Sequence, residues 1–329
     1  MTGRARAVAV AAAVAALAVA LGGCRGRDRS GALRLGYFPN VTHAQALVGL
    51  SDGTLARALD GRLEAKAFTA GPSAMEALLS GDVDVCYVGP GPAAIAYLRT
   101  RGDALRVIAG AASGGAELVV RDARGPADLA GKRVASPQIG NTQDVALRWW
   151  LRANGLSDRG GPHGVQVTPL SNADVLSMFA RGDIAGAWVA EPWAARLVAA
   201  GGRILVDERT LWPEGRFPTA VLVASSRALR ERRAELRALL EAHEELTARW
   251  RRDPAAFAEA ANRKYGELTG KPLDALVLRD AFSRVEPLSD PLAPQLAEEA
   301  RRAQVLGFAP AGDVSGMVDA SLLAEIVRR

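Results

Sequence analysis

The sequence predicts an α/β protein made of two similar lobes with a ligand cleft between them. Short apolar runs, such as residues 33–37 and 83–88, alternate with helical patterns, which is typical of βαβ units and a mainly parallel sheet. The chain also contains an internal repeat at a constant offset of 101 residues. With 329 residues, of which 49% are apolar, it is long enough for two domains that each have a core.

The internal repeat covers two separate segments. Residues 73–94 align with residues 174–195, and the same offset places residues 33–46 over residues 134–147. In each pair a strand, a loop and a helix follow in the same order, which indicates two lobes of one plan. Ligands bind outside the carboxyl ends of the strands in such folds, so the cleft between the lobes is the expected site.

The repeat also suggests where the lobes begin and end. We expect lobe one at residues 33–120 and lobe two at residues 121–218, with residues 219–329 returning to lobe one. The C-terminal part is too polar and too rich in helical patterns to form a third sheet domain. The chain would then cross between the lobes twice, near residues 117–122 and 216–222, and these crossings would act as hinges.

The N-terminal segment predicts export and a lipid anchor. Two arginines precede an unbroken apolar run over residues 7–21, which is short for a membrane span and typical of a secretory signal. The run ends Leu-Gly-Gly-Cys24, which resembles the lipobox of bacterial lipoproteins. We expect residues 1–23 to be a signal peptide, Cys24 to be lipidated and residues 24–32 to tether the protein on the outer side of the cytoplasmic membrane. An ordinary cleavable signal with an incidental cysteine is the alternative.

Composition excludes several classes of function. Charged residues make up 23% of the chain and the mean hydropathy is near zero, which fits neither a disordered chain nor a polytopic membrane protein. The densest basic run, residues 227–237, contains interleaved glutamates, which is typical of a solvated helix face and not of a nucleic-acid site. Two cysteines and three scattered histidines predict neither a disulfide scaffold nor a metal site.

Polar loops at the expected strand ends carry the candidate ligand contacts. Residues 140–143, Gly-Asn-Thr-Gln, precede an amphipathic helix, and a helix N-terminus offers free N–H groups and a positive dipole end. An anion is therefore the expected ligand, although plain N-capping by Asn141 or Thr142 explains the same residues. The expected contacts are Asn40, His43, Gln45, Gly89, Ser113, Gly114, Asn141, Thr142, Gln143, Trp188 and Glu191.

Three of these residues have a structural alternative. A single histidine such as His43 is more often structural, and a tryptophan such as Trp188 more often belongs to a core. Glu191 would repel a simple anion, so it either caps its own helix or meets a donor on the ligand. The second possibility favours an organic ligand, such as an amino- or hydroxy-substituted sulfonate, over bare nitrate.

The sequence carries none of the common catalytic motifs. It lacks G-x-S-x-G, H-E-x-x-H and the phosphate-binding pattern G-x-x-x-x-G-K-[ST]. In residues 89–92, Gly-Pro-Gly-Pro, the prolines remove two N–H donors, which argues against a dinucleotide-binding loop. We therefore expect a binding protein with no catalytic residues, no cofactor and no metal ion.

Three segments together resemble the substrate-binding lipoproteins of ABC importers for nitrate, sulfonates and taurine. They are LRLGYFPNVTHAQALVG from Leu33, ASPQIGNTQDVALRWWLRANGL from Ala135 and AWVAEPWAARLV from Ala187. The resemblance implies a periplasmic-binding-protein fold, with two α/β lobes joined by two hinge crossings. It also implies a monomer that captures a small anionic solute in its cleft and delivers it to permease and ATPase subunits. By position, relatives hold their ligand at Asn40, Ser113, Gly114, Asn141, Thr142 and Glu191.

The resemblance leaves two other functions open. An enzyme branch with this fold resembles the pyrimidine synthase of thiamin biosynthesis, but that class needs a cysteine-rich segment, whereas Cys86 stands alone in a buried apolar run. A ligand-sensing lipoprotein that presents its cleft to a receptor is the other alternative. The sequence by itself does not separate a sensor from an importer subunit.

Overall fold

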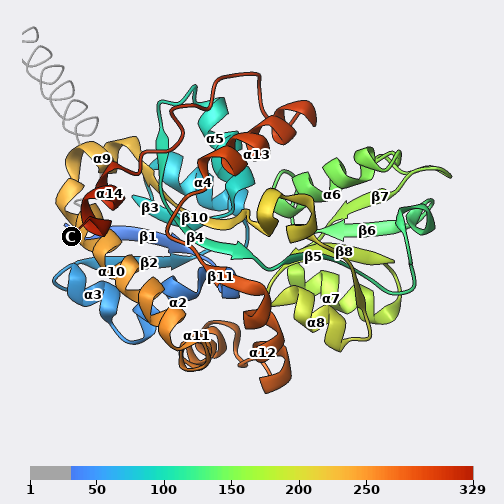
Figure 1. Ribbon diagram of the computed structural model, residues 1–329, viewed down its shortest axis with the longest axis horizontal. Coiled ribbons are helices and arrows are strands. Elements are labelled where there is room, and N and C mark those ends of the chain that lie inside the picture. Colours follow the sequence, from blue (N-terminus) through green and yellow to red (C-terminus); the bar gives the residue numbers. More distant parts are fainter. Residues whose placement is uncertain (1–30, 329) are drawn as a thin grey trace, which may run out of the picture. The chain divides into compact units, whose positions relative to one another are not determined.

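Two β-sheets organise residues 31–328, the part of the chain that the computed structural model describes (Figure 1). The first sheet has the strand order β11-β4-β10-β3-β1-β2 and the second has the order β7-β6-β8-β5-β9. The expected α/β fold with two sheets is therefore confirmed. The expected signal peptide and Cys24 lie outside the described residues. The strands are β1 (Leu33–Tyr37), β2 (Leu63–Ala67), β3 (Val85–Val88), β4 (Leu105–Gly114), β5 (Ala116–Val120), β6 (Arg133–Ser136), β7 (Gln166–Pro169), β8 (Gly186–Ala190), β9 (Arg203–Asp207), β10 (Pro218–Ser225) and β11 (Val285–Pro287).

The two sheets follow the same plan, as the internal repeat predicts. The order β2-β1-β3-β10-β4 in lobe one matches β7-β6-β8-β5-β9 in lobe two. In the first sheet β1 pairs in parallel with both of its neighbours and β10 runs antiparallel to both of its own. In the second sheet β6 and β5 have the same two roles. Each antiparallel strand is the first one that the chain forms after crossing from the other lobe. Helix α4 (Gly71–Ser80) and helix α7 (Asn172–Arg181) begin 101 residues apart, which is the offset of the repeat.

The first crossing lies at Gly115, between β4 of the first sheet and β5 of the second. Gly114 and Gly115 have φ values of 74° and 66°, a left-handed conformation that glycine adopts at little cost. A Cβ on Gly115 would also overlap the side chain of Val285. This crossing precedes the expected boundary at residue 120, and β5 belongs to lobe two. The boundary falls inside one long apolar stretch, where composition does not change.

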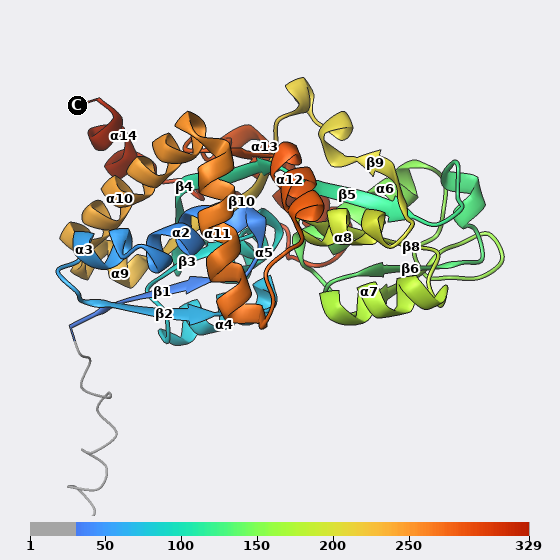
Figure 2. The ribbon, with the colours of Figure 1, turned by 90° about the horizontal axis from the view of Figure 1, so that it is seen from below.

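Helices cover the faces of both sheets (Figure 2). The C-terminal region bridges the lobes. Helices α10 (Arg233–Arg252) and α11 (Pro254–Thr269) contact α2 (Ala44–Ser51) of lobe one, and α12 (Ala275–Arg284) contacts α8 (Trp193–Ala199) of lobe two. Helix α13 (Ala293–Val305) contacts both α5 (Pro90–Arg99) of lobe one and α6 (Thr142–Ala153) of lobe two. The second crossing runs through two short 3-10 helices, η3 (Glu208–Leu211) and η4 (Pro213–Gly215). The other helices are η1 (Val41–His43), α3 (Thr54–Ala58), η2 (Pro126–Leu129), α9 (Ser226–Glu231) and α14 (Ser321–Val327).

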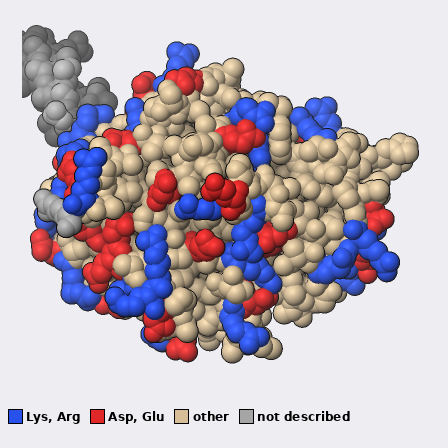
Figure 3. Space-filling model, in the orientation of Figure 1, with Lys and Arg blue, Asp and Glu red and all other residues tan. Residues whose placement is uncertain are grey.

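Apolar side chains fill both faces of each sheet. In β5, Leu118 and Val120 contribute to one core and Val119 contributes to the core on the opposite face, as the alternation of side chains along a strand requires. All three side chains are fully buried. Among residues 31–328, no helix is both long enough and apolar enough to cross a membrane. The face shown in Figure 3 carries intermingled acidic and basic side chains, without a single-sign patch that would suit nucleic acid.

Candidate ligand site

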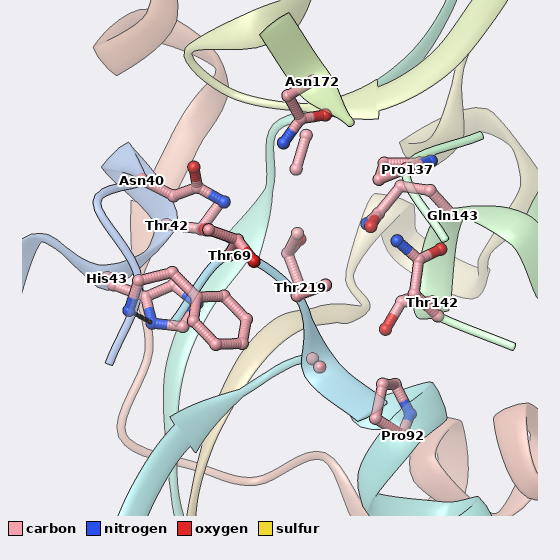
Figure 4. Close-up of a pocket in the computed structure, with 16 residues that line it drawn as sticks. Asn40, Thr42, His43, Thr69, Pro92, Pro137, Thr142, Gln143, Asn172 and Thr219 are labelled. Atoms are coloured by element: carbon pink, nitrogen blue, oxygen red, sulfur yellow. Dashed lines mark hydrogen bonds between the residues drawn. The ribbon is translucent and has the colours of Figure 1, made fainter. Parts of the chain in front are cut away.

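A small pocket lies where segments of both lobes meet (Figure 4). The side chains of Asn40 and Thr69, from lobe one, lie on the opposite side of this pocket from those of Thr142 and Gln143, from lobe two. The space is about 40 Å³, enough for a few water molecules or one small polar group. We call it the inner pocket; it is lined by Phe38, Asn40, Thr42, His43, Thr69, Ala70, Gly71, Gly89, Pro92, Pro137, Asn141, Thr142, Gln143, Asn172, Ala190 and Thr219.

Four helices begin at the inner pocket. Helix α4 starts at Gly71, α5 at Pro90, α6 at Thr142 and α7 at Asn172, so two come from each lobe. The first N–H groups of a helix have no intrahelical acceptor, and the helix dipole places a partial positive charge there. Among the described residues that line the pocket none carries a formal charge. In α5, however, Pro90 and Pro92 have no N–H, and the Gly91 N–H donates to the Thr142 hydroxyl. An anion held in the pocket would therefore be stabilised by the dipole ends of the four helices, by the first N–H groups of the other three and by neutral side-chain donors.

The loop before α6 caps the helix and also lines the pocket. The Asn141 side chain accepts a hydrogen bond from the Asp144 N–H at 2.8 Å, which makes it the N-cap of α6. Asp144 is turned away from the pocket, because its carboxylate accepts from the Ser136 hydroxyl at 2.7 Å and pairs with Arg148 at 3.1 Å. Asn141 and Thr142 nevertheless line the inner pocket. The N-cap is therefore observed, whereas contact of these residues with a ligand stays a prediction.

His43 lies in the wall of the inner pocket as a neutral imidazole. Its side chain is buried, and burial lowers the pKa of the ring to about 3. Its Nδ1 accepts a hydrogen bond from the Phe38 N–H at 3.3 Å, so the ring proton resides on Nε2. The Phe38 ring stacks on the imidazole with 4.6 Å between ring centroids. His43 therefore offers a neutral N–H donor and no charge at neutral pH.

The two lobes touch beside the pocket through two glycines of the α5 N-terminus. The Gly91 N–H donates a hydrogen bond to the Thr142 hydroxyl at 3.1 Å. A Cβ at Gly89 would overlap that same hydroxyl group, and a Cβ at Gly91 would lie 3.0 Å from the Thr142 Cα. The absence of side chains at these positions lets the lobes approach this closely.

The structure brings part of the expected site together. Asn40, His43, Gly89, Asn141, Thr142 and Gln143 line the inner pocket. Gln45, Ser113, Gly114, Trp188 and Glu191 do not line it.

The residues outside the pocket have structural partners. The Gln45 side chain is buried and donates to the Ala111 carbonyl at 2.7 Å. Ser113 and Gly114 belong to β4, where they pair with β11. The Trp188 indole is fully buried and donates to Glu208 at 2.8 Å. Strand pairing and core packing therefore account for these four positions.

Glu191 is fully buried beside the first crossing. One carboxylate oxygen accepts from the Ala195 N–H at 3.0 Å, in the first turn of α8, and the other pairs with Arg284 at 2.6 Å. This arrangement corresponds to the alternative in which Glu191 caps its own helix. Arg284 is 93 residues away in the chain, so no local pattern predicts that it pairs with Glu191. The repulsion expected between Glu191 and an anionic ligand does not arise in the inner pocket.

Several lining residues were not among the sequence candidates. Thr69 follows β2, and Thr219 lies in β10 after the second crossing. Asn172 begins α7, and the repeat offset places it over Gly71, which begins α4. The repeat could therefore have pointed to Asn172, whereas Thr219 depends on how the chain returns to lobe one.

Comparisons with known proteins agree with this architecture. The model of the NMT1-like family matches residues 27–264. The taurine-binding periplasmic protein of Escherichia coli (strain K12) is 31% identical over 166 residues, which cover 49% of each chain. The chain thus spans about half the length of the curated relatives it matches.

Solved structures have a similar fold over most of the chain. The alkanesulfonate-binding protein of Xanthomonas axonopodis pv. citri, bound to MOPS, aligns with a TM-score of 0.69 at 22% identity and covers 91% of this chain and 99% of that one. The periplasmic nitrate-binding protein of Synechocystis PCC 6803 aligns with a TM-score of 0.76 at 16% identity, covering 91% and 88%. The expected periplasmic-binding-protein fold is confirmed. Because the family model matches well over half of its residues, this chain belongs to the NMT1-like family.

Proposed function

We propose that the protein is the extracytoplasmic substrate-binding component of an ABC importer, which captures a small anionic solute between its lobes. The observation that carries this proposal is that four helices, two from each lobe, direct their positive dipole ends at an uncharged polar pocket, where α4, α6 and α7 also offer N–H donors. An oxyanion such as a sulfonate group or nitrate has the size and the acceptor atoms that such a pocket suits. The taurine- and nitrate-binding relatives support the same class of ligand.

We also propose that binding closes the lobes. The ligand would touch donors on both lobes, and the contact between Gly91 and Thr142 would form when they meet. A permease could distinguish the closed, ligand-bound protein from the empty protein by its shape. The permease and ATPase subunits would then be the partners, and the binding protein itself would act as a monomer.

The proposal includes no enzymatic activity. The Cys86 thiol is buried, and burial raises its pKa, so it is not a thiolate at neutral pH. The low pKa of His43 makes its ring a weak proton acceptor. The relatives named above are binding proteins, which does not favour the alternative of an enzyme related to thiamin biosynthesis.

Anchoring through a lipidated Cys24, after removal of residues 1–23 as a signal peptide, completes the proposal. Its support is the sequence pattern alone, since these residues lie outside the described part of the chain.

Isothermal titration calorimetry on the mature protein tests the proposed function. The probes are methanesulfonate, benzenesulfonate, hexanesulfonate, taurine and nitrate, with a neutral sulfone as the control. We expect at least one anion to bind and to raise the melting temperature by mass action, while the sulfone does neither. If no anion binds, or if the sulfone binds equally well, the proposed function is wrong.

A further inference from the structure

The inner pocket opens into a second, larger space. This outer chamber has a volume of about 530 Å³, and it shares Phe38, Asn40, Thr69, Ala70, Pro137 and Asn172 with the inner pocket. It is therefore larger than the space that would hold an anionic group. A bare inorganic anion would leave the chamber filled with water, whereas a ligand with an organic part would extend into it.

Three aromatic side chains from different parts of the chain line the outer chamber. Phe38 follows β1, Phe68 follows β2 and Trp193 begins α8, so the rings come from both lobes. Of the described residues that line the chamber none is charged. Apolar residues such as Pro39 and Pro137 and uncharged polar residues such as Ser73 and Thr269 complete its walls. Burying apolar ligand surface against such a lining is favourable, and aromatic rings prefer offset or edge-to-face contact with other rings.

A cage of aromatic rings can also bind a cation, and the neighbouring charges decide between the two occupants. The Lys66 ammonium lies 5.4 Å from the Phe68 ring centroid, and the Arg196 guanidinium lies 4.5 Å from the Trp193 centroid. Two of the three rings thus already have a cation of the protein beside them. A positively charged ligand group would be repelled by Lys66 and Arg196, whereas an uncharged ring would not.

From these observations we infer that the ligand carries an uncharged aromatic ring on its anionic group, as an aryl sulfonate does. The sulfonate would occupy the inner pocket and the ring would contact Phe38, Phe68 and Trp193 in the outer chamber. This inference rests on the proposed function, because it assumes that the inner pocket holds the anion. It disfavours taurine, whose ammonium group would lie near Lys66 and Arg196.

Calorimetry with a set of matched sulfonates tests the inference. Benzenesulfonate and hexanesulfonate have the same number of carbon atoms, methanesulfonate has the anionic group alone, and taurine adds an ammonium. We expect benzenesulfonate to bind about tenfold or more tighter than methanesulfonate and measurably tighter than hexanesulfonate, with taurine the weakest. Equal affinity for benzenesulfonate and methanesulfonate, or tightest binding of taurine, would overturn the inference. Failure of all four to bind would instead contradict the proposed function.

Substitution of Trp193 separates the outer chamber from the inner pocket. Trp193→Ala should weaken benzenesulfonate about tenfold and leave methanesulfonate within about twofold, while Trp193→Phe should retain most of the difference. Trp149→Ala is the matched control, because Trp149 is also partly exposed and lies 4.7 Å from an arginine, Arg301, but lines neither space. Melting temperatures establish that each variant is folded. An equal loss for both sulfonates in Trp193→Ala would mean that the ring does not contact the ligand, and the inference would fail.

Discussion

The Gly91 N–H of lobe one donates a hydrogen bond to the Thr142 hydroxyl of lobe two at 3.1 Å. Gly91 lies in the first turn of α5 and Thr142 begins α6, and the N-termini of both helices lie at the same pocket. The bond therefore links lobe closure to the group that would contact an anion. The hydrogen bond requires glycines on the lobe-one side, which let the helices approach, and the Thr142 hydroxyl on the lobe-two side.

Gly89→Ala should hinder closure. The backbone of Gly89 has φ −67° and ψ 152°, which alanine adopts readily, so backbone strain does not contribute. The new methyl would overlap the Thr142 hydroxyl, which separates the lobes. We expect anion affinity to fall at least tenfold and the radius of gyration measured with saturating ligand to stay near its unliganded value. Gly125→Ala is the control, since nothing lies within 4 Å of a Cβ there. Normal compaction of Gly89→Ala on binding would refute the steric argument.

Thr142→Ala should weaken anion binding by roughly ten- to a hundredfold, because a hydrogen bond to a charged group contributes about 1.5 to 3 kcal/mol. Thr142→Ser keeps the hydroxyl and should restore most of the affinity. Calorimetry with the sulfonate that binds best gives the comparison. If the alanine and serine variants bind equally well, the hydroxyl takes no part in recognition.

Stability should decline as the pH rises towards 8. Burial raises the pKa of Glu299 to about 8 and that of Glu208 to about 7, above their ordinary value of 4.5. Above about pH 4.5 the native state therefore binds more protons than the unfolded chain. The contribution of these two protonated carboxyls to the free energy of unfolding is complete below that pH, and it is lost as the pH rises through the raised pKa values. Urea unfolding between pH 5 and 8 measures this loss.

Glu299→Gln isolates one contribution to that pH dependence. Between pH 5 and 8 the wild type should lose on the order of 1 to 3 kcal/mol relative to this variant, because glutamine cannot ionise. The neighbouring Glu298→Gln is the control, since Glu298 is only partly buried and its contacts with Arg301 and Arg302 lower the pKa of its carboxyl. Parallel pH profiles for wild type and Glu299→Gln would show that Glu299 is ionised throughout.

Arg284→Met should destabilise the fold by about 3 to 5 kcal/mol, because it leaves the buried Glu191 carboxylate without its partner. The double variant Arg284→Met/Glu191→Gln should recover part of that loss. The relative affinities of the four sulfonates should be the same in Glu191→Gln as in the wild type, since Glu191 does not line the inner pocket. A selective loss of taurine binding in that variant would show instead that Glu191 contacts the ligand.

Cys24→Ala should release the mature protein into the soluble fraction, because the lipid would have no attachment site. Fractionation of cells that express the wild type and the variant gives the readout. Wild-type protein that is already soluble after removal of the signal would contradict the lipid anchor.

Local sequence patterns determined much of the fold and part of the candidate site. The alternation of strands and helices, together with the offset of 101 residues, predicted two lobes of one plan, because each repeat encodes the same local order of elements. The capping sequence around Asn141 marked the start of α6, since an N-cap is a local interaction over three residues. Asn141, Thr142 and Gln143 consequently lie in the pocket wall that the sequence placed there.

Only the tertiary structure decided how distant segments complete or avoid the site. Glu191 and Thr219 are the clearest examples: Glu191 is withdrawn from the pocket by Arg284, and Thr219 enters it because β10 inserts between β3 and β4 after the second crossing. The position of the first crossing, at Gly115, could likewise not be predicted, because it lies within a long apolar stretch. The physical reason is the same in each case. Strand pairing and ion pairs between residues far apart in the chain depend on which surfaces come into contact in the folded protein, and local sequence propensities do not determine those contacts.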